Sequence, residues 1–262
     1  MKLKNGKKNT NKKSILNIAL NVALVVFSLT FVTAVCLLVH SLGEYSRAKS
    51  EYQSLADLAI TIPNAEEPTL SSSLDVAHDK LSDKNDRYVG WIDIPDTVVS
   101  YPMVYAVNYF EYLYTTFEKE SNNSGCIFLD FRCKPDFSSK NTIIYGHRMN
   151  DGTMFGTLKN YFNKEYFDEH RIINIYTPDG TRMYEVFAVY YAISGDRSYD
   201  VDFESDEAYS EWLNYVVTNS AVKSNVDPSK SENVIMLSTC KGGDNEDRCV
   251  VFAALTSKNS EL

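Results

Sequence analysis

The longest apolar stretch of the chain is an uncharged run of 25 residues at positions 15–39, ILNIALNVALVVFSLTFVTAVCLLV. About 20 apolar residues suffice to cross a bilayer as a helix. The core of a secretory signal is shorter, about 7–15 residues, and is followed by a small-residue cleavage site. No such site follows this run, so the pattern predicts a membrane-spanning helix over 15–40. A buried core helix is the alternative.

The next apolar positions recur three or four residues apart, which is the spacing of one face of a helix. They are Leu42, Tyr45, Ala48, Tyr52, Leu55 and Ala59. Residues 61–86 are instead rich in proline, serine and acidic residues, a composition typical of a linker, with room for one short helix. We therefore expect a helical stalk and linker over 41–86.

From residue 87 onward, short apolar runs alternate with polar residues, which predicts β-strands. Residues 88–105 are interrupted by Pro95 and Pro102, and the tripeptide at 178–180 is a hairpin signal. Further strands are expected at 126–131, 141–145, 171–177, 182–193, 234–240 and 248–257.

Two segments have helical spacing instead, 153–162 and 205–221, and Ser205 is a suitable N-cap for the second. Many short strands with few helices predict a mainly β fold. The expected architecture is a closed β-barrel with helical insertions, and not a sheet of alternating strands and helices.

The distribution of charge predicts how the chain is oriented across the membrane. Six lysines precede the first acidic residue, Glu44, and all of them lie before the apolar run. By the positive-inside rule, residues 1–14 form a cytoplasmic basic tail and residues 41–262 lie outside the cell. The formal net charge of −9 argues against a general nucleic-acid-binding protein.

The five cysteines show neither a C-x-x-C pair nor a zinc-ligand spacing, so we expect no metal site. They are Cys36, Cys126, Cys133, Cys240 and Cys249. An odd number leaves at least one free thiol. Cys126 and Cys133 are either a disulfide or two packed thiols.

Cys240 is the cysteine whose surroundings suit a nucleophile, because it ends an apolar strand and two glycines follow it. Arg248 begins the next strand, and antiparallel pairing would return its guanidinium to the thiol. A permanent cation there favours the thiolate and can hold an oxyanion. His147 follows Gly146 at the tip of another strand and is the natural proton carrier. The alternatives are a buried core thiol and solvated surface charges.

These residues resemble a sortase, and class B sortases in particular. The resemblance rests on YGHRM at 145–149, LSTC at 237–240 and the arginine eight residues later, in that order. It extends through GWIDIPDTVVSYPMV, YLYTTF and SGCIFLDFR and runs from about residue 88 to the end. It implies an eight-stranded β-barrel cysteine transpeptidase over 87–262, on the surface of a Gram-positive cell.

The resemblance also implies roles for individual residues. Cys240 is the nucleophile, His147 the general acid/base, and Arg248 the oxyanion and substrate clamp. Tyr145 and Ser238 line the peptide groove, Leu113 makes an apolar contact with the substrate, and the Lys241 N–H supports the oxyanion. The helix over 205–221 flanks the groove.

The implied substrates are secreted proteins that carry a C-terminal sorting motif of Asn/Ser-Pro-x-Thr-Asn/Gly type, cleaved after the threonine. The acceptor is an amine of the peptidoglycan cross-bridge or stem peptide, and no cofactor is needed. Two other readings remain open. One is a surface cysteine protease that hydrolyses its substrate, although the papain-like order with cysteine before histidine is absent. The other is a non-enzymatic surface adhesin.

Overall fold

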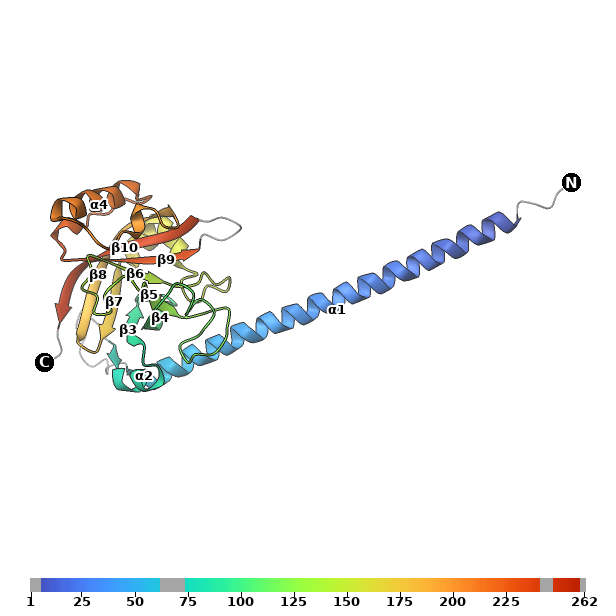
Figure 1. Ribbon diagram of the computed structural model, residues 1–262, viewed down its shortest axis with the longest axis horizontal. Coiled ribbons are helices and arrows are strands. Elements are labelled where there is room, and N and C mark those ends of the chain that lie inside the picture. The colour runs from blue at the N-terminus through green and yellow to red at the C-terminus, as the bar shows by residue number, and fades with distance from the viewer. Residues whose placement is uncertain (1–5, 62–73, 241–246, 260–262) are drawn as a thin grey trace. The chain divides into compact units, whose positions relative to one another are not determined.

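The protein is described by a computed structural model covering residues 6–61, 74–240 and 247–259. The chain divides into two units, Met1–Arg47 and Ala48–Leu262. One continuous helix, α1 (Gly6–Ala59), includes the whole apolar run (Figure 1). From Leu16 onward this helix is long and apolar enough to cross a membrane, by length and composition. The predicted helix over the apolar run is therefore confirmed.

The last turns of α1 belong to the second unit and bury one face there. Ala48, Tyr52, Leu55 and Ala59 are all nearly inaccessible to solvent. Their spacing of three to four residues places them on a single stripe, as the sequence predicts. After α1 the short strand β1 (Ile60–Thr61) pairs with β2 (Asp75–Val76).

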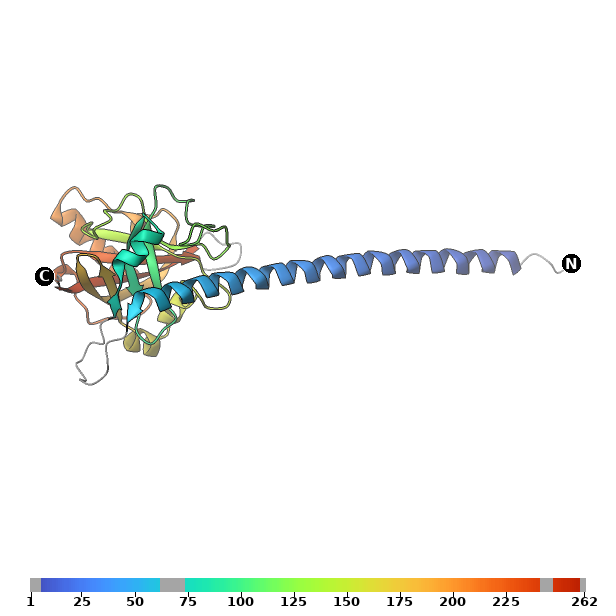
Figure 2. The same ribbon diagram turned by 90° about the horizontal axis from the view of Figure 1, so that it is seen from below.

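Eight strands of the second unit close into a barrel, as predicted (Figures 1 and 2). Around the barrel the order is β10-β8-β7-β3-β4-β5-β6-β9. The pairs β4–β5 and β6–β9 are parallel and the others are antiparallel. The strands are β3 (Tyr88–Asp93), β4 (Ser100–Tyr105), β5 (Ile127–Leu129), β6 (Asn141–Tyr145), β7 (Ile172–Thr177), β8 (Gly180–Ile193), β9 (Val234–Cys240) and β10 (Asp247–Asn259).

The burial of β9 explains why its sequence lacks an alternation of apolar and polar residues. Both faces are covered, because all residues from Val234 to Thr239 are buried. A strand packed on both sides has no polar face to alternate with. Only the last residue of the strand, Cys240, is exposed.

The helix α4 (Asp206–Asn219) supplies cover for part of the barrel and confirms the predicted second helix. Ser205 caps it by accepting a hydrogen bond from the Ala208 N–H at 3.2 Å. Trp212 packs edge-on against Phe252 of β10, with ring centroids 5.9 Å apart. The apolar stripe of α4 and residues of β8 and β10 thus form one buried cluster.

The other predicted helix, 153–162, is only partly correct. Residues 158–162 form a short 3-10 helix, η1 (Leu158–Phe162), whereas the residues before it form turns. A side chain at Gly156 would come within 2.6 Å of the Met149 carbonyl, so the chain is folded tightly back on itself there. The apolar residues of this segment pack the turn that follows His147.

The remaining helices are α2 (His78–Lys84), α3 (Lys164–Glu169), η2 (Arg197–Tyr199) and η3 (Pro228–Lys230). α2 falls in the segment expected to be a linker with one short helix, and it packs on β3 (Figure 2). α3 was not expected, because its acidic sequence has few apolar residues. Asn163 caps it by accepting from the Glu165 and Tyr166 N–H groups.

Candidate active site

Two strand pairings bring the predicted catalytic residues to one end of the barrel. β9 and β10 are antiparallel, and Cys240 pairs directly with Arg248 across the ladder. β6 and β9 are parallel, with Tyr145 opposite Ser238, and the Gly146 N–H donates to the Ser238 carbonyl at 3.2 Å. His147 therefore follows the end of β6 at the same level at which Cys240 ends β9.

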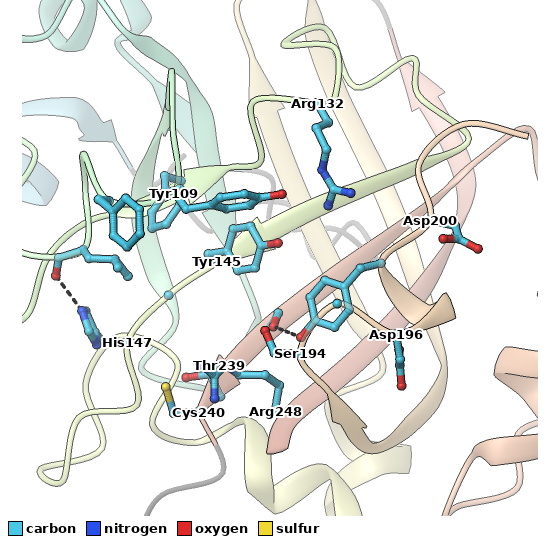
Figure 3. Close-up of a pocket in the computed structure, with 17 residues that line it drawn as sticks. Tyr109, Arg132, Tyr145, His147, Ser194, Asp196, Asp200, Thr239, Cys240 and Arg248 are labelled. Carbon is cyan, nitrogen blue, oxygen red and sulfur yellow. Dashed lines mark hydrogen bonds between the residues drawn. The ribbon is translucent and has the colours of Figure 1, made fainter. Parts of the chain in front are cut away.

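A cavity of about 510 Å³ opens at this end of the barrel and holds the predicted residues (Figure 3). Its lining includes all of them except Lys241, which lies outside the described residues. In Figure 3, Cys240, His147 and Arg248 lie at the same end of the cavity. Among the described residues, the lining consists of Tyr109, Phe110, Leu113, Phe128, Arg132, Tyr145, Gly146, His147, Ser194, Gly195, Asp196, Tyr199, Asp200, Ser238, Thr239, Cys240 and Arg248.

The segment before α4, and not α4 itself, forms one wall of this cavity. Residues 194–196 and 199–200 line it, whereas none of the described lining residues comes from α4. We expected this helix to flank the groove. The segment that leads into the helix flanks the cavity instead.

His147 is held by a backbone carbonyl. Its Nε2 lies 2.6 Å from the oxygen of Leu113, which can only accept a hydrogen bond, so Nε2 is the donor. In the neutral ring this leaves Nδ1 without a proton and able to accept one. Burial lowers the pKa of His147, and the bond to the Leu113 carbonyl opposes that shift only in part. The imidazole is thus neutral near pH 7 and suited to act as a base.

Leu113 has a role that the sequence did not indicate. The resemblance assigned its side chain to the substrate, and the residue does line the cavity. Its main-chain oxygen, however, is the hydrogen-bond partner of His147. The two residues are 34 positions apart, and no sequence pattern links a main-chain carbonyl to a distant imidazole.

Accessibility separates Cys240 from the other thiols of the second unit. Cys240 is exposed, whereas Cys126, Cys133 and Cys249 are buried, and all of them are free. Burial raises the pKa of Cys133 and of Cys249 to about 12, and it raises the pKa of Cys126 further. Protonated, enclosed thiols are poor nucleophiles, so Cys240 is the thiol of this unit that is open to a substrate.

The opposite wall of the cavity contains a charged network that the sequence analysis missed. Arg132 forms a two-pronged ion pair with the fully buried carboxylate of Asp130, through Nε at 3.0 Å and Nη2 at 2.8 Å. The Tyr145 hydroxyl donates to the same carboxylate at 2.9 Å. Burial, and then the charge of Asp130, raises the pKa of Tyr145, which keeps this hydroxyl protonated. The only sequence signal was a carboxylate directly after a buried strand.

Ser238 lines the cavity and its hydroxyl already has a partner. It is 1% exposed, and its Oγ lies 2.9 Å from the hydroxyl of Tyr199. Burial raises the pKa of Tyr199 to about 12, and the Ser238 hydrogen bond counteracts this in part. The rings of Tyr145 and Tyr199 stack with centroids 6.4 Å apart. Ser238 therefore holds Tyr199, one ring of an aromatic wall, through its hydroxyl.

Comparison with known proteins decides the family. The sortase domain family matches residues 92–256, which is more than half of the chain. The chain belongs to the sortase family. Sortase B of Staphylococcus aureus (strain NCTC 8325 / PS 47) is 32% identical to it over 179 residues, covering 68% of this chain and 73% of that relative.

Solved sortase structures share the fold of the second unit. A crystal structure of sortase B from Bacillus anthracis in complex with AAEK1 matches with a TM-score of 0.70 and 29% identity, covering 82% of this chain and 98% of that chain. A Staphylococcus aureus sortase B–substrate complex matches with a TM-score of 0.69 and 27% identity, covering 81% and 98% respectively. The predicted class B sortase barrel is confirmed, and the protein is a cysteine transpeptidase enzyme.

Proposed function

We propose that this sortase cleaves secreted proteins at a C-terminal motif of Asn/Ser-Pro-x-Thr-Asn/Gly type and transfers them to a cell-wall amine. The observation that carries the proposal is the shared cavity. An exposed thiol, a neutral imidazole and a guanidinium line the same 510 Å³ space at one barrel end. This is the set of groups that acyl transfer through a thioester requires.

In the first half-reaction the Cys240 thiol gives its proton to Nδ1 of His147 as the sulfur attacks the threonine carbonyl. The carbonyl oxygen becomes an oxyanion, which Arg248 and the N–H of Lys241 stabilise. The C–N bond then breaks, and the imidazolium returns the proton to the departing amine. A thioester on Cys240 and a free amine remain, and His147 is neutral again.

In the second half-reaction an acceptor amine attacks the thioester. His147 takes a proton from the amine, the C–S bond breaks, and the proton returns to the sulfur. The product is a new peptide bond and a restored thiol. Amine transfer competes with hydrolysis, so the cavity must favour the amine over water.

The peptide groove is assigned to the walls around these three residues. Tyr145 provides an aromatic surface, Ser238 holds the neighbouring ring of Tyr199 through its hydroxyl, and Leu113 lines the same cavity. A related sortase B has been solved as a substrate complex, which supports placing the sorting peptide in the matching cavity here. The acceptor is then a peptidoglycan cross-bridge or stem-peptide amine.

We place the enzyme at the cell membrane, with α1 as its anchor. In this arrangement residues 1–14 lie in the cytoplasm, 15–40 span the bilayer, 41–86 form the stalk and linker, and 87–262 form the extracellular catalytic domain. The support is the length and apolar composition of α1 from Leu16 and the lysines that precede it.

The test is to incubate the full chain, in detergent micelles, with a sorting-peptide library and candidate amines, and to identify the products by mass. We expect a cut after threonine and an amide with one acceptor, with the acyl-enzyme mass on Cys240. Cys240→Ala should abolish both products, and Cys249→Ala, a matched buried thiol, should retain them. Cleavage without any amine adduct would favour a hydrolase, and no cleavage of any motif would overturn the proposal.

A further inference from the structure

We propose that Tyr52, near the end of α1, is a positioning residue for the imidazole of His147. Tyr52 lies outside the cavity and does not touch the site where the substrate would bind. It acts through the loop between β4 and β5, which contains Leu113. The role of His147 in this inference rests on the proposed function. The contacts that link Tyr52 to His147 do not depend on it.

The first link is the Tyr52 hydroxyl. The Tyr52 side chain is 7% exposed, and its hydroxyl donates to the carbonyl oxygen of Gly125 at 2.5 Å. The two residues are 73 positions apart, so this bond ties the last turns of α1 to the end of the β4–β5 loop. Burial raises the pKa of Tyr52, and the neighbouring Cys126 thiol adds to that shift, so the hydroxyl remains a donor.

The second link is the close contact of Gly125 with the main chain of Tyr112 and Leu113. Gly125 has a φ of +57°, and an added Cβ would lie 2.5 Å from each of the two carbonyl oxygens. The next residue, Cys126, donates its N–H to the Tyr112 carbonyl at 3.0 Å. The position of Gly125 therefore sets the position of the 112–113 backbone.

The third link reaches the imidazole. The carbonyl of Leu113 accepts from His147 Nε2 at 2.6 Å, the contact drawn as a dashed line in Figure 3. This bond decides which ring nitrogen carries the proton and how the ring is turned. A displaced Leu113 carbonyl would leave the neutral imidazole free to exchange tautomers, and the fraction with an unprotonated Nδ1 would fall.

The ring of Tyr52 provides a second route to the same residue. It packs edge-on against Tyr101, with centroids 5.3 Å apart. The Tyr101 hydroxyl accepts from the Met154 N–H at 3.0 Å, and the Phe155 N–H donates to the His147 carbonyl at 2.9 Å. Tyr52 thus supports the imidazole through its hydroxyl and the backbone of His147 through its ring.

The decisive variant is Tyr52→Phe, which keeps the ring and removes only the hydroxyl. Since one buried hydrogen bond is lost, we expect kcat to fall roughly fivefold while KM changes little. The matched control is Tyr209→Phe. Tyr209 is 5% exposed and its hydroxyl donates to the Lys140 carbonyl at 3.2 Å, before the start of β6. It should lower the melting temperature by a similar amount and leave kcat unchanged.

A spectroscopic readout tests the positioning without relying on activity. The full chain in detergent micelles is labelled with ¹⁵N-histidine, and a His147→Gln spectrum assigns the His147 signals among the four histidines. Wild type and Tyr209→Phe should show the Nε2–H tautomer, and Tyr52→Phe should show a mixture. If Tyr52→Phe does not fold, Gly125→Ala should produce the same mixture, because its Cβ would lie 2.5 Å from the Leu113 carbonyl and displace it. Tyr101→Phe leaves that carbonyl in place and should keep the Nε2–H tautomer.

The outcomes separate this inference from the proposed function. Unchanged His147 signals in Tyr52→Phe, together with a kcat equal to that of Tyr209→Phe, would overturn the positioning role. A changed tautomer in a protein that transfers no peptide would support the positioning role and refute the proposed function. A drop in kcat with an unchanged tautomer would also count against it, since the hydroxyl would then act by another route.

Discussion

Cys240 and Cys249 lie nine residues apart on neighbouring strands, and their surroundings are opposite. Cys240 is the last residue of β9 and is exposed in the cavity. Cys249 is the third residue of β10, pairs with Thr239 on one side and Tyr191 on the other, and is 1% exposed. Arg248 lies between the two regions, directly across from Cys240.

The difference shows how a barrel leaves one thiol accessible and encloses another. Within the wall, neighbouring strands and packed layers exclude water on both sides, and burial raises the pKa of Cys249 to about 12. At the strand end the ladder stops and solvent and substrate can reach the sulfur. Both side chains are cysteines, so their different accessibility comes from their positions in the barrel.

The largest effect is expected at Cys240. Cys240→Ala removes the sulfur that would form the thioester, and loss of a nucleophile from a working catalytic unit costs on the order of 10⁶-fold in kcat. Transpeptidation measured by product mass should fall below detection. Cys249→Ala should retain nearly full activity, and equal losses in the two variants would contradict the comparison.

His147 should give the next largest effect. His147→Asn removes the proton carrier, and a drop of about 10²–10⁴-fold in kcat is expected. Because burial lowers the pKa of His147, the wild-type rate should hold as the pH falls through about 6.5, the ordinary histidine value. It should decline only at lower pH, when the imidazole becomes charged and can no longer accept the thiol proton.

The pH profile of kcat/KM for a sorting peptide measures that decline. An acidic limb centred above about 6.5 would mean that the charged imidazole is favoured in the folded enzyme. That result would contradict the burial described for His147. His170, a second histidine of this unit, offers a control, since His170→Asn should leave the profile unchanged.

Arg248 should show a smaller loss that depends on geometry. Arg248→Gln removes the charge that faces the oxyanion, and a decrease of about 10²–10³-fold in kcat is expected. Arg248→Lys keeps a charge but lacks the planar fork of donors, so it should recover only part of the rate. Full recovery with lysine would show that charge alone matters, and steady-state kinetics distinguishes the two cases.

The smallest effect concerns stability. Cys249→Ser places a hydroxyl in an apolar wall, and an unsatisfied buried polar group costs about 1–3 kcal/mol of unfolding free energy. Cys249→Ser should keep its activity and have a lower melting temperature. Cys240→Ser should leave the melting temperature nearly unchanged. Thermal unfolding of both variants side by side measures this. A larger loss of stability for Cys240→Ser would reverse the assignment of exposed and buried thiols.

Local sequence explains much of the fold because strand and helix patterns depend on near neighbours. The apolar runs at 234–240 and 248–257 became β9 and β10, and their antiparallel pairing placed Arg248 opposite Cys240 as expected. The helical spacing at 153–162 led to a prediction that was only partly correct. The apolar residues at the start of this segment lie in turns and not on one face of a helix. Residues of the charged wall, such as Arg132, had no sequence pattern to identify them.

By itself, the sequence determined the long apolar helix and the strand-rich second unit, and it singled out the three side chains proposed for acyl transfer, because these follow from residue type and short-range spacing. Only the tertiary structure decided that the Leu113 carbonyl holds His147, that Asp130 holds Arg132 against Tyr145, and that Tyr52 ties α1 to the loop beside them. Hydrogen bonding and loss of water depend on which groups meet in space. Partners such as Tyr52 and Gly125, 73 residues apart, meet only once the barrel has closed.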